Sequence, residues 1–300
     1  MSDRVEIIAE IGSNHDGDLD TAKRYVEACA KAGADAVKFQ TLARETLIAP
    51  NVRDPQSGQW IDNPKYEAFG NLALSDDWHF QLKACADETG IEFMSTPFSL
   101  EAVDLLETVG VKRYKLASGD LTFRPLQARV AATGKPVLLS TGASYLAEVR
   151  QAVAALQAGG ASDITVLQCT ASYPPGFEEL NLRAIPTLGE ALGLPVGLSD
   201  HSPGLVAPIA AASLGARVIE KHITFDRTLP GPDHPFAMTM EELADLVIAM
   251  RQLEAALGDG EKAPAPSEAH RRARLRRGVY DPVSFLPAKD GVWLRPEHGE

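Results

Sequence analysis

Short apolar runs alternate with amphipathic stretches along most of this 300-residue chain. The runs are continuous rather than alternating in polarity, which is typical of parallel strands buried on both faces. Between the first two runs, residues 19–33 place Ala22, Val26, Cys29 and Gly33 at helical spacing, and most later helical stretches also end near a glycine. The pattern predicts strands at 5–12, 36–42, 92–98, 113–118, 136–141, 164–170, 195–201 and 218–224.

This order of elements predicts an α/β protein, a (β/α)₈ TIM barrel over residues 1–258 with a short C-terminal extension. A doubly wound open sheet is the alternative. It fits less well because no G-x-G-x-x-G follows the first strand and polar residues end nearly every strand. About thirty residues, 43–76, separate the second strand from its helix. A loop of that length is usually functional or mobile, and we expect it to act as a lid over the substrate.

The composition changes after Gly258. Residues 258–270, GDGEKAPAPSEAH, are rich in Pro, Ala and charge, as a linker is, and the remaining residues are too few for an independent core. The basic cluster HRRARLRR at 270–277 is interpreted as a solvated helical or linker segment, with anion binding as the alternative.

A formal net charge of −12 argues against a duplex nucleic acid as partner, because phosphate recognition needs clustered Lys and Arg. No apolar run reaches membrane-spanning length, and the N-terminus does not resemble a signal peptide. Cys29, Cys85 and Cys169 are odd in number and widely spaced, unlike a disulfide framework. We expect a cytoplasmic protein without a membrane or nucleic acid partner.

Polar residues gather where the predicted strands end, and in a parallel barrel these ends converge on one face, where barrel enzymes keep their chemistry. His79 and His270 lie outside this set and are expected at the surface. The strand ends supply Glu10, Ser13, Asn14 and His15; Lys38 and Gln40; Ser95 and Thr96; Lys115 and Ser118; Ser140 and Thr141; Gln168, Thr170 and Tyr173; Ser199, Asp200 and His201; Glu220 and His222.

Two of these residues, Lys38 and Lys115, are lysines in apolar strands, where an unpaired charge is costly. One interpretation is an internal ion pair with Glu10 or Glu220. We favour a phosphate or carboxylate site, because several Ser and Thr hydroxyls lie beside the lysines, some in glycine-containing turns.

His201 and His222 end two strands that a crossover helix, 205–215, places side by side. Each imidazole could be a buried, hydrogen-bonded side chain. Together, with Glu10 or Glu220 in reach, they suggest a divalent metal with positions open to water or substrate. His15 and His234 are loop histidines that could also approach this site.

Asp233 belongs to the loop DRTLPGPDHPF, residues 226–236, in which Pro and Gly fix a turn. We expect Asp233 to point back over the barrel mouth and contact substrate. The alternative is a side chain that only caps the turn.

A series of motifs, in this order, resembles the sialic acid synthase family over about residues 5–255: IIAEIGSNHDGDLDTAKRYVEACAKAGADAVKFQT, FMSTPFS, YKLASGD, LLSTG, CTASYP, GLSDH, IEKHIT and DRTLPGPDH. The resemblance implies a (β/α)₈ barrel that condenses phosphoenolpyruvate with N-acetylmannosamine or a related amino sugar. The products would be phosphate and a nonulosonic acid such as N-acetylneuraminate. It also implies a divalent metal, Mn²⁺ or Mg²⁺, and a homodimer.

Matched motif by motif, the resemblance makes His201 and His222 the metal ligands. It gives the phosphoenolpyruvate anion to Lys115, Thr96, Ser118, Ser140 and Ser199, with Lys38 nearby. Glu10, Gln40, Tyr173 and Asp233 would face the sugar, with Glu10 as the candidate for proton transfer, its pKa tuned by Lys38. The chain departs from the family at Ala171, where Ser or Asn is frequent, and at Asp120, where Glu is frequent.

The family usually carries a C-terminal antifreeze-like domain that swaps across a dimer and offers an arginine to the partner's sugar. RRGVY and LRPEHGE resemble the opening of that domain, with Arg295 at the family's Arg-Pro pair, so residues 259–300 are expected to be a linker and a truncated remnant. Two other functions stay open. One is a 3-deoxy-2-ulosonate synthase for a different aldose or aldose phosphate, and the other is a non-catalytic subunit that binds sugar or phosphoenolpyruvate.

Overall fold

A computed structural model describes residues 4–295 of the chain. Two units can be separated, one ending at Ala256 and the other beginning at Leu257, close to the change in composition after Gly258. Each unit is described by itself below. Within residues 4–295, no helix is both long enough and apolar enough to span a bilayer.

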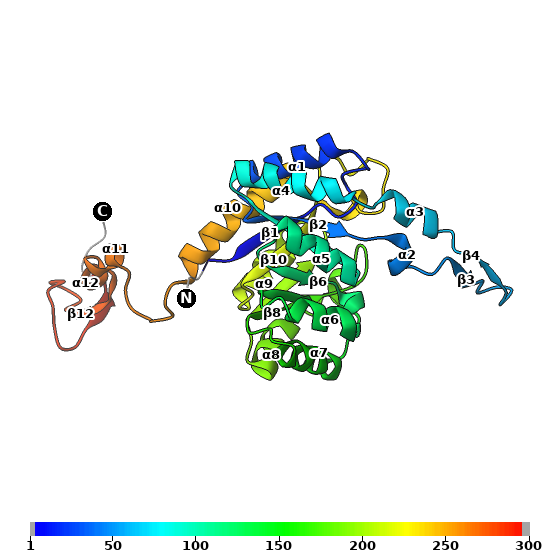
Figure 1. Cartoon of the computed structure of the whole chain (residues 1–300). Coiled ribbons are helices and arrows are strands. Elements are labelled where there is room, and N and C mark those ends of the chain that lie inside the picture. The colour runs from blue at the N-terminus through cyan, green and yellow to red at the C-terminus, as the bar shows by residue number, and fades with distance from the viewer. Residues whose placement is uncertain (1–3, 296–300) are drawn as a thin grey trace. The chain divides into compact units, whose positions relative to one another are not determined.

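Eight parallel strands form the wall of the first unit (Figure 1). Their order around the barrel is β5-β2-β1-β10-β9-β8-β7-β6, and the end strands β5 and β6 contact each other, so the barrel is nearly closed. The predicted (β/α)₈ barrel is therefore confirmed. The strands are β1 (Glu6–Glu10), β2 (Ala36–Thr41), β5 (Glu92–Pro97), β6 (Tyr114–Leu116), β7 (Val137–Ser140), β8 (Ile164–Cys169), β9 (Val196–Asp200) and β10 (Val218–Thr224).

The major helices cover the outside of the barrel. In the first of them, the Asp18 side chain accepts the Thr21 amide at the N-terminus, and Gly33 ends the helix with φ of 91°, a conformation that favours glycine. Tyr25 and Val26 are buried on its inner face. The helices are α1 (Leu19–Ala32), α4 (Asp76–Thr89), α5 (Leu100–Val109), α6 (Arg124–Ala131), α7 (Leu146–Ala158), α8 (Ala184–Leu192), α9 (Val206–Ser213) and α10 (Met240–Leu257). Shorter elements are η1 (Ser118–Asp120), η2 (Phe177–Glu179), η3 (His234–Phe236) and β11 (Met238–Thr239), which pairs with β10.

Alternation along the strands divides the barrel interior into an apolar layer and a polar layer. A small cluster of buried apolar residues fills the barrel interior on the N-terminal side of the polar layer: Ile8, Ala36, Met94, Leu138, Leu167 and Val218. Two residues further along their strands, on the same face, are Glu10, Lys38, Thr96, Ser140, Cys169 and Glu220. The strands therefore carry their polar side chains inward at the C-terminal mouth.

The segment between β2 and α4 is more ordered than the long loop we expected. It contains α2 (Arg44–Leu47), an antiparallel hairpin of β3 (Asn51–Arg53) and β4 (Trp60–Asp62), and α3 (Tyr66–Asn71). The hairpin projects from the barrel (Figure 1). These elements are three to six residues long, too short to show a period in the sequence. We call residues 43–75 the β2–α4 excursion.

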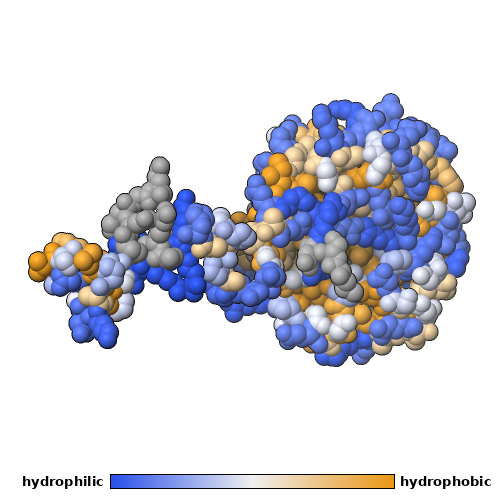
Figure 2. All heavy atoms as spheres, turned by 90° about the vertical axis from the view of Figure 1, so that its left-hand side faces the viewer, coloured by the Kyte–Doolittle hydropathy of each residue, from blue (hydrophilic) through white to orange (hydrophobic). Residues whose placement is uncertain are grey.

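The second unit contains two short helices, α11 (Pro266–Ala269) and α12 (Arg272–Leu275), and a hairpin of β12 (Gly278–Tyr280) with β13 (Val292–Leu294). Arg271, Arg272 and Arg276 of the basic cluster are exposed, and so is Arg295. Figure 2 shows hydrophilic side chains interspersed with apolar ones on the face of the barrel turned to the viewer.

Candidate active site

A cavity of about 520 Å³ opens at the C-terminal mouth of the barrel. Side chains from the ends of all eight barrel strands line it, and three residues of the β2–α4 excursion join them. All twelve residues predicted from the sequence lie in its wall: Glu10, Lys38, Gln40, Thr96, Lys115, Ser118, Ser140, Tyr173, Ser199, His201, His222 and Asp233. Their roles are argued below.

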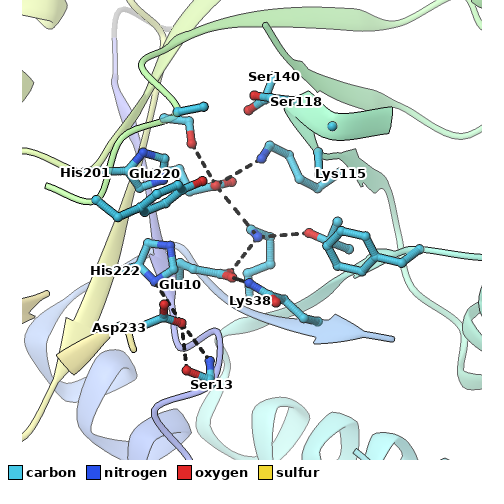
Figure 3. A pocket seen from close by; sticks show the side chains of 18 of the residues that line it. Glu10, Ser13, Lys38, Lys115, Ser118, Ser140, His201, Glu220, His222 and Asp233 are labelled. Carbon is cyan, nitrogen blue, oxygen red and sulfur yellow. Dashed lines mark hydrogen bonds and ion pairs between the residues drawn. The ribbon is translucent and has the colours of Figure 1, made fainter. Parts of the chain in front are cut away.

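Both inward lysines are paired with carboxylates (Figure 3). Lys38 Nζ lies 2.6 Å from Glu10 Oε2 and donates to Thr96 Oγ1 at 3.0 Å. Lys115 Nζ lies 3.0 Å from Glu220 Oε1, and the same oxygen is 3.7 Å from Lys38 Nζ. The internal ion pair that we considered for these lysines is thus present, and Glu220 is shared between them.

The two carboxylates are held in different protonation states. Burial raises the pKa of Glu10 to about 7, and the nearby Lys38 only partly opposes this. Burial also acts to raise the pKa of Glu220, but Lys115 and Lys38 overcome it and lower that pKa to about 2. Glu10 can therefore exchange a proton near neutral pH, whereas Glu220 remains an anion.

Hydroxyl groups stand beside Lys115. Ser199 Oγ donates to Glu220 Oε1 at 3.1 Å, and Ser118 Oγ accepts the Gly142 amide at 2.9 Å. Ser140 Oγ is buried and has no hydrogen-bond partner within residues 4–295. A buried hydroxyl without a partner is unfavourable, so this one is available for a ligand.

The two predicted metal ligands lie side by side, with ring centroids 5.4 Å apart. His201 Nδ1 lies 3.0 Å from the Thr170 carbonyl oxygen. Because a carbonyl can only accept, Nδ1 carries the proton and donates it, and in the neutral ring Nε2 then has a free lone pair. Burial, assisted by His222, lowers the pKa of His201 to about 4, and burial also lowers that of His222. Both rings are neutral at pH 7, the form that binds metals.

His222 has a free nitrogen of its own. Its Nδ1 is buried with no hydrogen-bond partner in the described chain, and Asp233 Oδ2 lies 3.7 Å away. Among residues 4–295, no group of three or more His, Cys, Asp or Glu side chains is arranged to hold a metal ion. The free nitrogens of His201 and His222 are the donors that would suit a divalent cation, with its other positions left to water and substrate.

Asp233 lines the cavity and lies beside Ser13 and His222, as Figure 3 shows. Its Oδ2 accepts from the Ser13 amide at 3.1 Å and from Ser13 Oγ at 2.8 Å. Gly12 lies close to this oxygen. A Cβ at position 12 would lie 2.7 Å from Asp233 Oδ2, and the φ of 55° is a conformation that favours glycine. Asp233 thus joins the loop after β10 to the loop after β1.

His15 and His234 do not line the cavity. His234 is fully buried and hydrogen-bonded to Thr224 Oγ1 at 2.7 Å and to Asp16 Oδ1 at 3.1 Å, so it braces the loop that carries Asp233. His15 Nδ1 accepts the Gly17 amide at 3.1 Å. Both histidines support the loops rather than face the cavity.

The prediction that His79 lies at the surface was wrong, whereas His270 is exposed. His79 is fully buried, and its ring bonds Thr41 Oγ1 at 2.8 Å and the Ser75 carbonyl at 2.9 Å. Its helical spacing to buried Leu82 and Ala86 was the signal that places it on the inner face of α4.

Some residues of the cavity were not predicted as site residues. Glu220 was recognised at a strand end, but its place between two lysines requires the three-dimensional structure. Ser13 holds Asp233. Four partly buried apolar side chains also line the cavity: Leu47, Phe69, Leu72 and Phe98.

Fold and site together define a (β/α)₈-barrel enzyme whose mouth holds two buried lysine–carboxylate pairs beside two neutral imidazoles. Residues 25–262 match the model of the NeuB family, and the chain belongs to this family. It is thus an enzyme of the family's nonulosonic acid synthase type.

Three similar proteins illustrate the family. The N,N'-diacetyllegionaminic acid synthase of Legionella pneumophila is 42% identical over 305 aligned positions, which cover 98% of this chain and 86% of the relative. Human N-acetylneuraminate-9-phosphate synthase is 34% identical over 93% of this chain and 78% of its own length. The crystal structure of an N-acetylneuraminic acid synthetase from Leptospira borgpetersenii, in complex with citrate, superposes with a TM-score of 0.80 at 34% identity, covering 90% of each chain.

Proposed function

We propose that the protein condenses phosphoenolpyruvate with an open-chain 2-acetamido sugar, giving a nonulosonic acid and phosphate. The observation that carries the proposal is the juxtaposition of two environments in one cavity. Lys115 and the unpartnered Ser140 hydroxyl form an anion-binding end, and two neutral imidazoles lie beside Glu10 and Asp233 at the other end. Family membership supports the same reaction class.

The anion-binding end suits the phosphate and carboxylate of phosphoenolpyruvate. Lys115 and Lys38 can turn from Glu220 toward the substrate anion, and Ser140 donates its free hydroxyl. Thr96, Ser118 and Ser199 complete the cradle. Holding the anion at several points fixes C3 of phosphoenolpyruvate against the aldehyde of the sugar.

His201 and His222 would hold a divalent cation, Mn²⁺ or Mg²⁺, which when bound supplies Lewis-acid polarisation of the sugar aldehyde. The Thr170 carbonyl orients His201 so that Nε2 faces away from its hydrogen bond. Gln40, Tyr173 and Asp233 would position the sugar. The ring centroids of Tyr173 and His201 are 4.2 Å apart, so the aromatic ring shields this part of the site.

Glu10 is assigned the proton transfers. As C3 of phosphoenolpyruvate bonds to the aldehyde carbon, protonated Glu10 donates to the aldehyde oxygen, which becomes a hydroxyl. Water then adds at C2 and returns a proton to Glu10. The C–O bond to phosphate breaks as the new C2 hydroxyl gives its proton to the leaving phosphate, and the 2-keto acid remains. The pKa of about 7 permits both donation and acceptance at neutral pH.

The test is incubation of the purified protein with phosphoenolpyruvate, Mn²⁺ and a panel of 2-acetamido sugars and simple aldoses, with phosphate release and product mass recorded. A product with the mass of the acceptor plus the pyruvate unit supports the proposal. Product from an aldose without an acetamido group would instead indicate a different ulosonate synthase. Thermal stabilisation by phosphoenolpyruvate and Mn²⁺ with no product from any acceptor would indicate a binding subunit.

We also expect a cytoplasmic homodimer. Three free, buried cysteines fit a reducing compartment, and phosphoenolpyruvate is a cytoplasmic metabolite. Size-exclusion chromatography with light scattering measures the oligomer.

A further inference from the structure

Cys169 is the last residue of β8, and it lines the active-site cavity. It is 7% exposed, and its register partner on β9 is Ser199. Its thiol lies within hydrogen-bonding reach of the side chains of Ser118 and Ser199. A Cβ added to Gly142 would lie 2.9 Å from Ser118 Oγ and 3.2 Å from Cys169 Sγ, so both side chains pack against the same glycine. The thiol therefore stands between two hydroxyls of the proposed phosphoenolpyruvate cradle.

The two ends of this group of side chains fix the direction of its hydrogen bonds. At one end, the Gly142 amide donates to Ser118 Oγ at 2.9 Å, and an amide N–H can only donate. At the other end, Ser199 Oγ donates to Glu220 Oε1 at 3.1 Å, and the ionised carboxylate can only accept. The thiol can do both, so it accepts from the Ser118 hydroxyl and donates to Ser199 Oγ. Every donor in this chain therefore points in one direction, from the backbone amide toward the carboxylate.

The chain requires an uncharged thiol. A thiolate could not donate to Ser199, and it would place a second anion beside Glu220 at the end of the cavity that is proposed to receive phosphoenolpyruvate. Burial raises the pKa of Cys169 above its ordinary value, although Ser118, Lys115 and Ser199 act to lower it. The thiol is thus protonated at neutral pH and can serve as both donor and acceptor.

We propose that Cys169 is a positioning residue of the anion-binding end, whose thiol holds the hydroxyls of Ser118 and Ser199 where they receive phosphoenolpyruvate. Because the donor and the acceptor of the thiol are both taken by the serines, it acts through them rather than on the substrate. Fixing both hydroxyls before the substrate arrives reduces the conformational entropy that is lost on binding. The inference rests on the proposed function and adds Cys169 to the residues that serve its anion site.

Three substitutions of Cys169 separate hydrogen bonding from packing. Cys169→Ser keeps a donor and an acceptor in a smaller side chain, Cys169→Val fills the space with neither, and Cys169→Ala lacks both the volume and the hydrogen bonds. The Kd for phosphoenolpyruvate, from isothermal titration with Mn²⁺ present, should rise about 3- to 10-fold in Cys169→Ala and Cys169→Val and stay within about twofold of the wild type in Cys169→Ser. In turnover, the KM for phosphoenolpyruvate should follow the same order, while kcat and the KM for the sugar change little.

Two further sets of variants test how the thiol acts. Cys29→Ala and Cys29→Ser are the matched controls, because Cys29 is buried on α1 and does not line the cavity. They should lower Tm and leave the Kd for phosphoenolpyruvate unchanged. Ser118→Ala combined with Cys169→Ala should raise that Kd by less than the product of the two single effects, since one hydroxyl that the thiol positions is already gone.

The outcomes separate the two proposals. An equal rise in Kd in Cys169→Ser and Cys169→Ala, or wild-type affinity in Cys169→Val, overturns the positioning role and leaves the proposed function standing. Independent effects in the double variant also overturn it. If the wild type neither binds phosphoenolpyruvate nor gives product from any acceptor, the proposed function is overturned, and the role of Cys169 falls with it.

Discussion

Lys221 and Asp200 form an ion pair directly behind the two site histidines. Lys221 Nζ lies 2.7 Å from Asp200 Oδ2, and the two side chains are only 2% and 0% exposed. They are register partners on β10 and β9, and each immediately adjoins a histidine, His222 or His201. Lys221 also donates to the Ser202 carbonyl, while the Ser202 amide donates to Asp200 Oδ1 at 2.9 Å. The pair therefore fixes the backbone on both sides of His201.

Lys221→Met should destabilise the fold severely, because it leaves the Asp200 carboxylate buried without its partner. We expect a loss of about 3–5 kcal/mol in the free energy of unfolding and a fall of roughly 10 °C in Tm, measured by calorimetry. Lys83→Met is the control, since Lys83 pairs with Asp87 at 2.5 Å on the surface of α4, where such pairs contribute about 1 kcal/mol or less. Equal effects of the two substitutions would contradict the prediction.

A double variant separates stability from the positioning of the histidines. Asp200→Asn combined with Lys221→Met removes both charges and should recover much of the lost stability. Because the bridge between β9 and β10 is still broken, Mn²⁺ should bind more weakly than to the wild type in isothermal titration. Wild-type Mn²⁺ affinity in a destabilised single variant would show that the pair has no role in positioning His201.

Much of this site could be predicted because its residues follow the period of a strand. Lys38 and Gln40, and likewise Glu220 and His222, are two residues apart and therefore share the inward face. Which carboxylate pairs with which lysine could not be predicted, because from the sequence either Glu10 or Glu220 could pair with Lys38 or Lys115. Only the strand order places Glu220 between both lysines, and that arrangement keeps its pKa low.

Some other features could not be predicted, because their residues show no periodic pattern of apolar and polar positions in the sequence. The β2–α4 excursion is built from elements of three to six residues, so its hairpin was not foreseen and neither were the apolar side chains that it contributes to the cavity. His79 was misplaced because a polar side chain was assumed to be exposed. Burial is tolerated there because both ring nitrogens are hydrogen-bonded.

The protonation of Glu10 should govern the pH dependence of the reaction. The pKa of about 7 predicts that kcat/KM falls as the pH rises through 7, when the proton needed by the aldehyde oxygen is lost. Glu10→Gln should lower kcat about 100- to 1000-fold and remove that inflection, while phosphoenolpyruvate still binds. A retained inflection near pH 7 in Glu10→Gln would assign the proton to another group.

The same carboxyl group affects stability in a defined direction. Its pKa is higher in the folded protein, about 7, than the ordinary value of 4.5 for a glutamate side chain. Its contribution is therefore fully present below pH 4.5 and is lost as the pH rises through 7, up to about 3 kcal/mol. Urea unfolding at pH 4.5 and pH 8 measures it as the difference between wild type and Glu10→Gln. If the wild type were more stable relative to Glu10→Gln at pH 8 than at pH 4.5, the predicted direction of the pH dependence would be wrong.

Metal dependence follows from the neutral state of both histidines. Prolonged treatment with a chelator should abolish phosphate release, and Mn²⁺ should restore it. His222→Ala should lose activity that excess Mn²⁺ does not recover, because one of the two proposed ligands would be gone. Full activity in the metal-free protein would refute the assignment of His201 and His222.

Ser140 and Thr141 are neighbours, but only the Thr141 hydroxyl has a hydrogen-bond partner within the described residues of the protein. Substituting each in turn therefore distinguishes an effect on substrate binding from an effect on folding. Ser140 Oγ is buried and has no partner in the described part of the chain, whereas Thr141 Oγ1 donates to the Leu167 carbonyl at 2.9 Å. Ser140→Ala should leave Tm unchanged or slightly higher and raise the KM for phosphoenolpyruvate about 10-fold, since a hydrogen bond to a charged group contributes about 1.5–3 kcal/mol. Thr141→Val should instead lower the free energy of unfolding by about 1 kcal/mol with little change in that KM. If Ser140→Ala lowered Tm and left the KM alone, its hydroxyl would belong to the fold and not to the anion site.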